Sequence, residues 1–472
     1  MPARLLMIGL DGADGRLLDR HSADGSLPHL AALRARGRVQ CLTAPPGITD
    51  DATWASFQYA VEVGEHGRYH YRLPLGEGEL GMAHRQEEDR LTFWDELSSL
   101  GVRVAILDVP KCRNPRPLNG IHLVDWLVHG RYFDQPRSQP PALAAEILDR
   151  FGHAPSSRCG YRQPVLGDGD VRDITGNLRA AVAKKRAAGL HYLAAEPWDL
   201  FVVGFKEAHC CGHAFWDFDA GHPAHDPARR ARLGDPTMTI LRDVDSAVGD
   251  LVAAAGPSAE VVVFSTTEFV PNGCLNHLMP GIVERLNARL SASPATPLAL
   301  APTGSRPAPS PSGWQCAILP YNENCTALRV TRRSPTPRAE ARPAVRPDPR
   351  PLEAIEAELR SLRDAATGER VVSTITRPSS ELVGSRATTL PDLLVHCASG
   401  CFPDAVESQS LGRIEGRIPA MRPGNHRAGG FVVAAGTFVT AAIADVRSIA
   451  GFGSLAMSVL DRSLRLPTSA IE

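Results

Sequence analysis

Short apolar runs alternate along the chain with longer segments whose apolar positions repeat at helical spacing. This alternation is typical of an α/β protein with a mainly parallel sheet covered by helices. The predicted strands are Leu5–Leu10, Val102–Val109, Leu200–Phe205, Val261–Phe264 and Leu393–Val395. The predicted helices are Leu27–Arg36, Thr92–Leu100, Ala142–Phe151, Asp173–Ala194, Leu241–Ala255, Pro280–Leu290 and Pro351–Leu362.

Two proline-rich stretches, Ser291–Ser312 and Arg332–Arg350, interrupt the pattern. Neither has enough apolar residues to fold alone, so we expect surface loops around a small subdomain that contains Cys316–Val330. The predicted organisation is a main α/β domain over 1–290, an inserted subdomain over 291–380, and a return to the main domain over 381–472.

Composition narrows the function classes. The 472 residues carry a formal net charge of −1, which argues against a nucleic acid polymer or an anionic membrane as partner. The longest uncharged stretch, Gly429–Ala444, is shorter than the ~20 residues that span a bilayer. The apolar run near the N-terminus is too short for a secretory signal, so we expect a cytoplasmic protein. The ten cysteines form no CxxC pair, which favours free thiols.

Two histidines directly follow a predicted strand. His209 and His213 are four residues apart after Leu200–Phe205, and side chains at this spacing share one face of a helix or turn. Imidazole is a common metal ligand, and open α/β sheets place their ligands at the carboxyl ends of strands. The pair is therefore a candidate metal site.

Further segments extend this pattern and carry a resemblance to a known family. They are GLDG, LPHLAALRARG, TWASF followed by GEHG, RVAILDVP, NGIHLVDW, the HxxxHAFW segment, NHLMP, ALRV, PDLLV and NHRAGG, in that order. Together they resemble the type I phosphodiesterase and nucleotide pyrophosphatase branch of the alkaline phosphatase superfamily. The resemblance implies an alkaline phosphatase-like fold, a large mainly parallel sheet flanked by helices, with two divalent metals at the strand ends.

The resemblance implies ligands residue by residue, with departures. Asp11 matches the first metal aspartate, and His426 matches the last metal histidine. The family pattern D-x-x-x-H becomes His209 and His213 here. The family's Asp-His-Gly, which supplies two ligands to the second metal, falls on Ser265–Thr267. Two threonine hydroxyls cannot replace a carboxylate and an imidazole, so we expect one metal rather than two.

The catalytic residue is left open between two neighbours. The family's nucleophile stands four residues before Trp54, where this chain has Asp50; Thr49 takes that role if the loop has gained one residue. Asp11, Asp50 and Asp51 are candidates for a fourth ligand, a partner of a ligand or a general base. The candidate substrate-binding residues are Asp51, Asn276, His277 and Asn322.

The expected cofactor is one divalent ion bound by His209, His213 and His426, with Asp11 beside it. Three imidazoles with an open position favour zinc, and manganese and iron are the alternatives. The predicted function is a metal-dependent hydrolase or group transferase in bacterial specialised metabolism, acting on a phosphorylated or other anionic small molecule. The alternative is a catalytically inactive, ligand-binding descendant. A homo-oligomer is compatible with either hypothesis.

Overall fold

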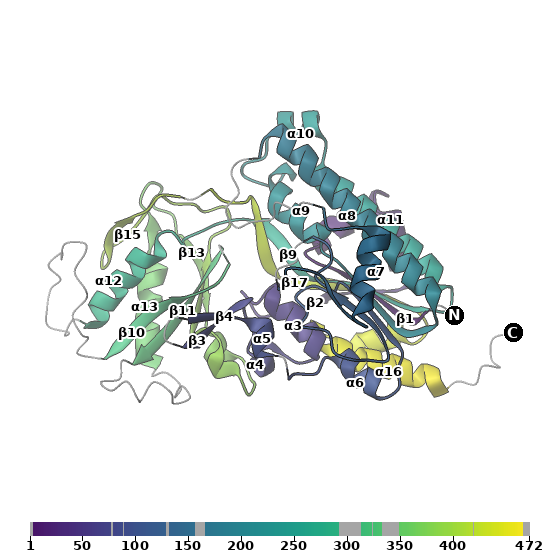
Figure 1. Ribbon diagram of the computed structural model, residues 1–472. Helices are drawn as coiled ribbons and strands as arrows, with labels where there is room; N and C mark the ends of the chain where they lie inside the picture. Colours follow the sequence, from purple (N-terminus) through teal and green to yellow (C-terminus); the bar gives the residue numbers. More distant parts are fainter. Residues whose placement is uncertain are drawn as a thin grey trace. The chain divides into compact units, whose positions relative to one another are not determined.

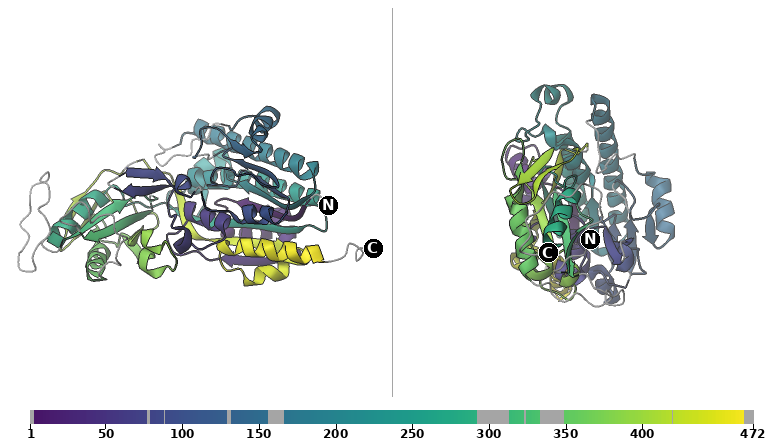
Figure 2. Two further views of the ribbon diagram at one scale, coloured as in Figure 1. Left: turned by 60° about the horizontal axis from the view of Figure 1, so that its bottom comes forward. Right: turned by 90° about the vertical axis from the view of Figure 1, so that its left-hand side faces the viewer.

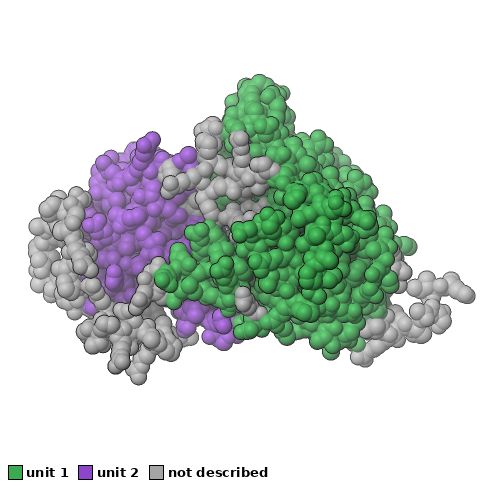
Figure 3. All heavy atoms as spheres, in the orientation of Figure 1, with its two compact units in different colours: residues 1–62, 68–271, 422–472 green, residues 63–67, 272–421 purple. Residues whose placement is uncertain are grey.

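The computed structural model describes residues 3–76, 79–87, 89–128, 132–155, 166–291, 313–322, 324–332, 349–418 and 420–465. The chain divides into two compact units, coloured separately in Figure 3. Unit 1 comprises residues 1–62, 68–271 and 422–472, and unit 2 comprises 63–67 and 272–421. Unit 2 thus begins before and ends after the range 291–380 expected for the inserted subdomain.

An eight-stranded sheet forms the centre of unit 1, in the order β2-β17-β9-β1-β8-β5-β6-β7. Strands β9, β1, β8, β5 and β6 are mutually parallel, whereas β17, β2 and β7 run antiparallel to their neighbours. The prediction of a large, mainly parallel sheet is confirmed. The strands are β1 Ala3–Leu10, β2 Arg38–Leu42, β5 Val104–Leu107, β6 Gly120–Val124, β7 Arg137–Gln139, β8 Trp198–Phe205, β9 Glu260–Pro271 and β17 Gly424–Ala435, with a separate hairpin of β3 Arg72–Gly76 and β4 Glu79–Met82.

Helices cover both faces of this sheet (Figures 1 and 2). In β1, Leu6 and Ile8 enter one apolar core, while Leu5 and Met7 enter the other, because successive side chains of a strand point to opposite faces. The first core contains α1 Gly15–Ala23, α2 Pro28–Arg36, α7 Ala142–Phe151, α8 Asp168–Ala195, α9 Glu207–Phe215 and α11 Pro236–Ala255. The second contains α3 Asp51–Tyr59, α6 Phe93–Ser99, α15 Val439–Ala442 and α16 Phe452–Arg465. Two short helices, α5 Ala83–Gln86 and α10 Pro227–Leu233, complete unit 1.

Unit 2 has its own core around a four-stranded antiparallel sheet in the order β10-β11-β14-β13. The predicted strand Leu393–Val395 exists, but it is a member of this antiparallel sheet and not of the main one. A short apolar run predicts a buried strand without identifying its neighbours. The elements are β10 Trp314–Leu319, β11 Cys325–Arg332, β12 Arg363–Asp364, β13 Val372–Thr376, β14 Leu393–Cys397, β15 Ala405–Ser408, β16 Gly412–Glu415, α4 Val63–His66, α12 Met279–Ser291, α13 Pro349–Ser361 and α14 Pro378–Glu381.

Among the described residues, no helix is both long and apolar enough to cross a bilayer.

A buried histidine makes the stability of unit 1 sensitive to acid. His122 on β6 is 1% exposed, and among the described residues neither ring nitrogen has a hydrogen-bond partner. Burial lowers its pKa to about 3. Because this pKa lies below the ordinary value of 6.5, the stability it governs is complete above pH 6.5 and falls as the pH drops toward 3. The loss is about 1.4 kcal/mol at pH 5.5.

We expect His122→Leu to remove this loss. The measurement is urea unfolding of both proteins at pH 7.5 and pH 5.5. The free energy of unfolding should fall less between these two pH values in the variant than in the parent protein. Exchange of the exposed His153 for alanine is the control and should leave the pH dependence unchanged. An identical acid sensitivity in His122→Leu and the parent protein would contradict the prediction.

Candidate metal centre and active site

Three histidines from distant parts of the chain meet in unit 1. His209 and His213 lie on α9, which follows β8, and His426 lies on β17. His213 Nε2 is 3.0 Å from His426 Nε2, although 213 residues separate them. The ring of His209 lies with its centroid 4.6 Å from each of the other two. All three are at most 3% exposed, and their donor atoms lie within 4.8 Å of one another.

The hydrogen bonds of His213 indicate which nitrogen faces this meeting point. Its Nδ1 lies 2.8 Å from the carbonyl oxygen of Gly424. A carbonyl only accepts, so Nδ1 carries the proton and Nε2 carries the lone pair. Burial lowers the pKa of His213 and of His426 well below the ordinary value. Both rings are therefore neutral at neutral pH, as metal ligation requires.

Two aspartates face the remaining histidine. Asp11 directly follows β1, and Asp50 directly precedes α3. His209 Nδ1 lies 3.2 Å from Asp11 Oδ2 and 3.9 Å from Asp50 Oδ1. The indole Nε1 of Trp54 donates to Asp11 Oδ1 at 2.8 Å and so holds that carboxylate in place. Asp11, Asp50 and His209 form a second group of donors within 4.8 Å of one another.

A lysine that the sequence analysis did not select stands beside these carboxylates. Lys111 Nζ lies 3.2 Å from Asp50 Oδ2 and 3.7 Å from Asp51 Oδ1. Asp51 also accepts from the hydroxyl of Tyr132 at 2.9 Å and lies 3.5 Å from Arg68. A signal existed, because Lys111 closely follows β5 and is one of only four lysines in the chain.

Strained backbone marks two of these residues. Asp50 has a φ of 42° and Lys111 a φ of 58°, in a region that side-chain-bearing residues seldom occupy. Such conformations cost about 1–3 kcal/mol each and cluster at functional sites. Asp50 also occupies the cap position of α3, while Thr49 is buried one residue earlier. The described contacts of the site thus include the Asp50 carboxylate.

The segment that matches the family's ligands for a second metal carries two hydroxyls. Thr266 and Thr267 on β9 are buried, and among the described residues their side-chain oxygens have no hydrogen-bond partner. The neighbouring carboxylate of Glu268 accepts from Arg427 at 2.9 Å. As the sequence suggests, this segment offers a metal ion only hydroxyl groups from its two threonines, and these are weak ligands.

The remaining candidates lie in unit 2 and take part in its internal hydrogen bonds. Asn276 Nδ2 donates to the carbonyl oxygen of Asn322 at 3.2 Å, and the Thr326 hydroxyl donates to Asn276 Oδ1. His277 Nε2 donates to the carbonyl oxygen of Pro403 at 2.8 Å. These contacts support the local fold, and a role of Asn276, His277 and Asn322 in substrate binding stays a prediction.

A buried charge network anchors the start of α9. Asp108 accepts from Lys206 Nζ at 2.9 Å and from Lys185 Nζ, and also from the backbone N–H groups of Trp126 and Leu127. Asp108, Lys185 and Lys206 are at most 1% exposed. Burial alone would raise the pKa of Asp108, but the two ammonium groups hold it below its usual value. Since Lys206 directly precedes α9, the network fixes the strand end from which His209 projects.

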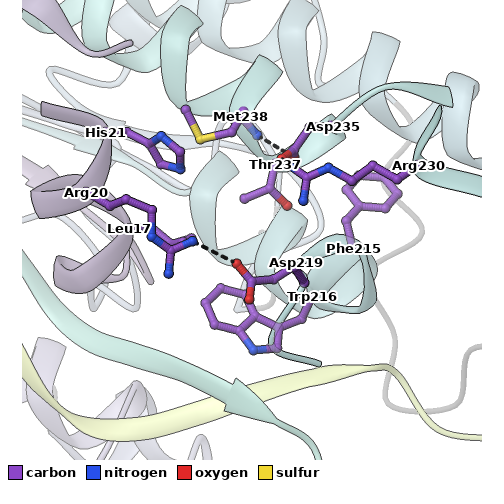
Figure 4. A pocket seen from close by; sticks show the side chains of 11 residues that line it. Leu17, Arg20, His21, Phe215, Trp216, Asp219, Arg230, Asp235, Thr237 and Met238 are labelled. Atoms are coloured by element: carbon purple, nitrogen blue, oxygen red, sulfur yellow. Dashed lines mark hydrogen bonds and ion pairs between the residues drawn. The ribbon is translucent and has the colours of Figure 1, made fainter. Parts of the chain in front are cut away.

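A separate small hollow lies at the other end of α9 (Figure 4). Arg20 pairs with Asp219 at 3.4 Å, and Asp235 accepts from the backbone N–H of Met238 at 3.0 Å. Its lining residues include none of the catalytic or metal candidates.

Comparison with solved structures supports the fold. Phosphonoacetate hydrolase from Sinorhizobium meliloti 1021 in complex with phosphonoformate superposes with a TM-score of 0.55 at 12% identity, over 97% of this chain and 96% of that one. Its complex with phosphonoacetate gives 0.52 at 13% identity, over the same shares. An inactive form of murine ectonucleotide pyrophosphatase/phosphodiesterase 5, in complex with AMP, gives 0.47 at 11% identity, over 97% and 95%. The two hydrolase structures confirm an alkaline phosphatase-like fold.

Sequence comparison supplies the family. A search of curated proteins gives no match. The family model described as type I phosphodiesterase / nucleotide pyrophosphatase matches residues 5–286, which include Asp11, Asp50, His209 and His213. The chain belongs to the type I phosphodiesterase / nucleotide pyrophosphatase family.

Proposed function

We propose that this protein is a metal-dependent hydrolase that acts at the phosphorus of a small anionic phosphoester or phosphonate. The observation that carries the proposal is the convergence of three buried imidazoles beside two aspartates. Clusters of this kind in a metal-dependent family are suited to binding a catalytic ion. A divalent ion held there would act as a Lewis acid toward a phosphoryl oxygen.

The donor set fits one ion, and zinc best. His213 Nε2 and His426 Nε2 approach one point. The two carboxylates face Nδ1 of His209, and we assign the Nε2 of that ring as the third nitrogen. Hydrogen bonds that orient metal-binding histidines through their other nitrogen are common in such sites. Three neutral nitrogens with an open position suit zinc, whereas manganese prefers more oxygen ligands.

We assign no second metal ion to the donor group of Asp11, Asp50 and His209, because a lysine ammonium group already lies beside it. Lys111 already places an ammonium group against Asp50 and Asp51. In the family, a carboxylate and an imidazole bind the second metal. In the described segment Ser265–Thr267, the side chains at these positions carry hydroxyl groups instead. In this proposal, the single positive charge of Lys111 partly offsets the two carboxylates, and its ammonium group binds an anionic oxygen of the substrate. Two tightly bound ions per chain would contradict this part of the proposal.

Asp50 is the proposed general base. It stands at the position of the family nucleophile, with one carboxylate oxygen near His209 and the other near Lys111. As an attacking water forms its bond to phosphorus, Asp50 accepts the water proton, and the leaving group departs with the electrons of the broken bond. Thr49 is the alternative, as a nucleophile whose hydroxyl attacks phosphorus directly.

Paired variants distinguish the two residues and test the activity. The zinc-loaded protein is assayed with phosphonoacetate, a nucleotide and a generic diester, with release of product as the readout. We expect Asp50→Asn to lower kcat by about 100-fold or more, the range of general-base loss, and Thr49→Val to change it by only a few-fold. A large loss confined to Thr49→Val would assign the chemistry to the hydroxyl. Absence of turnover on all three classes would favour the alternative of a non-catalytic binding protein.

Lys111 should govern substrate affinity more than metal content. Its replacement by methionine keeps the length of the side chain but removes the charge that offsets Asp50 and Asp51. We expect kcat/KM to fall by about 10- to 100-fold, mainly through KM, as loss of a hydrogen bond to a charged group predicts. The metal content should stay near one ion per chain, and Lys111→Arg should recover part of the affinity. An unchanged KM in the folded methionine variant would remove Lys111 from the substrate site.

A further inference from the structure

Two cysteines of unit 2 face each other across a tight turn. Cys397 ends β14, and Cys401 follows after Ala-Ser-Gly. The backbone N–H of Cys401 donates to the carbonyl oxygen of Ala398 at 3.1 Å, which closes the turn. The thiol of Cys397 donates to the carbonyl oxygen of Cys401 at 3.5 Å. Both residues are partly exposed, so a small reagent can reach them.

The turn is fastened to the segment that leads from β9 into unit 2. Gly400 N–H donates to the carbonyl oxygen of Asn272 at 3.0 Å, and Cys274 N–H donates to that of Cys401 at 2.9 Å. Gly273 lies so close that a Cβ atom there would come within 2.4 Å of the Ala398 carbonyl oxygen and 3.3 Å of Cys397 Sγ. The hydrogen bonds within the turn and those to the segment Asn272–Cys274 together fix the position of the two thiols.

The pKa values of the two thiols shift in opposite directions. Contact with Cys401, together with burial, raises the pKa of Cys397 well above its ordinary value. The same contact lowers the pKa of Cys401, the more accessible of the pair. Because the thiolate is the attacking species in disulfide exchange, Cys401 is the one expected to react first.

We propose that Cys397 and Cys401 form a reversible intramolecular disulfide, and that this bond stiffens the segment Asn272–Cys274 fastened to the turn. The proposal is independent of the hydrolase activity. The oxidant is a low-molecular-weight disulfide such as glutathione disulfide.

The exchange proceeds in two balanced steps. The Cys401 thiolate attacks one sulfur of glutathione disulfide; that S–S bond breaks, and one glutathione leaves as a thiolate that takes up a proton. Cys397 then loses its proton and attacks the Cys401 sulfur, and the second glutathione leaves in the same way. Two cysteine thiols are oxidised, and one disulfide is reduced to two thiols.

Trypsin provides a direct readout, because residues 387–413 form a single peptide whose only cysteines are Cys397 and Cys401. After treatment of the full-length protein with glutathione disulfide, we expect this peptide to lose the mass of two hydrogens and to resist alkylation until dithiothreitol is added. The peptide over residues 207–229 is the matched control, since it contains the adjacent Cys210 and Cys211. Both are buried, and burial raises the pKa of Cys211. Glutathione disulfide should therefore leave them as thiols, which are alkylated once the protein has been denatured.

Single variants test the order of attack and the stiffening. Cys397→Ser should stop at a glutathione adduct on Cys401, whereas Cys401→Ser should react much more slowly. Amide hydrogen exchange over residues 272–277 should slow several-fold in the oxidised protein and return on reduction. The proposal is overturned if both thiols of the 387–413 peptide stay alkylatable or carry only adducts, and the stiffening is overturned if the disulfide forms without slower exchange.

Discussion

Replacing His213 by alanine is expected to abolish metal binding at the proposed three-histidine centre and to lower kcat/KM by about 1,000-fold. The ring supplies one of three imidazoles, with its Nε2 only 3.0 Å from that of His426. Its loss leaves two nitrogens in a buried pocket, and a metal ion in such sites contributes several kcal/mol of transition-state stabilisation. Elemental analysis of the dialysed protein and steady-state kinetics on the same preparation measure both effects.

His222 offers a matched control for this experiment. Its Nε2 hydrogen-bonds the carbonyl oxygen of Pro423, and it lies outside both donor groups. His222→Ala should therefore retain about one ion per chain and most of the activity. If His213→Ala also kept its ion and its kcat/KM, the three-histidine centre would be wrong.

Loss of the Asp108 carboxylate is expected to cost about 3–5 kcal/mol of the free energy of unfolding, the usual range for breaking a buried ion pair. Asp108→Ala leaves the ammonium groups of Lys185 and Lys206 in the core without their shared counter-ion. It also removes the acceptor for the backbone N–H groups of Trp126 and Leu127. Urea unfolding at neutral pH, followed by circular dichroism, measures the loss.

Two further variants show how much of the stability loss comes from the buried charge and how much from the shape of the side chain. Asp243 pairs with Arg179 at 2.7 Å on the surface, and Asp243→Ala should cost less than about 1 kcal/mol. Asp108→Asn keeps the shape but removes the charge, so it should fall between the two. A cost for Asp108→Ala no greater than that for Asp243→Ala would show that the lysines find other partners.

Each strand and helix that the periodicity predicts is present in the structure, because each is defined by local sequence, but other elements, such as β2 and α3, were not predicted. The helix expected at Leu241–Ala255, for instance, ends as predicted and begins five residues earlier, at Pro236. The sheet to which a strand belongs is harder to predict from sequence than the existence of the strand. Leu393–Val395 and Leu200–Phe205 are both apolar runs, yet one pairs antiparallel in unit 2 and the other lies parallel in the main sheet. Partner choice depends on long-range packing, which a single strand does not encode.

Some residues of the candidate site can be predicted from sequence motifs, whereas others are identified only by their contacts in the folded protein. The three histidines and Asp11 were accessible because each follows or lies on a strand in a recognisable motif. Lys111 and Trp54 were missed as contacts, since their roles depend on distances to Asp50 and Asp11 that no spacing reveals. The scarcity of lysine was a usable signal: Lys111, Lys185 and Lys206, three of the four lysines, are buried in charged networks of unit 1.

The insertion of unit 2 between β9 and β17 has a consequence for biogenesis. These two strands are neighbours in the sheet, but residues 272–423, almost all of them in unit 2, separate them in the chain. During synthesis, β1, β8 and β9 leave the ribosome long before the strand that carries His426. The nascent chain therefore presents His209 and His213 without their third partner until all of unit 2 has been made. Contacts of such high sequence separation form late and slowly, so metal capture is expected to coincide with the last stage of folding.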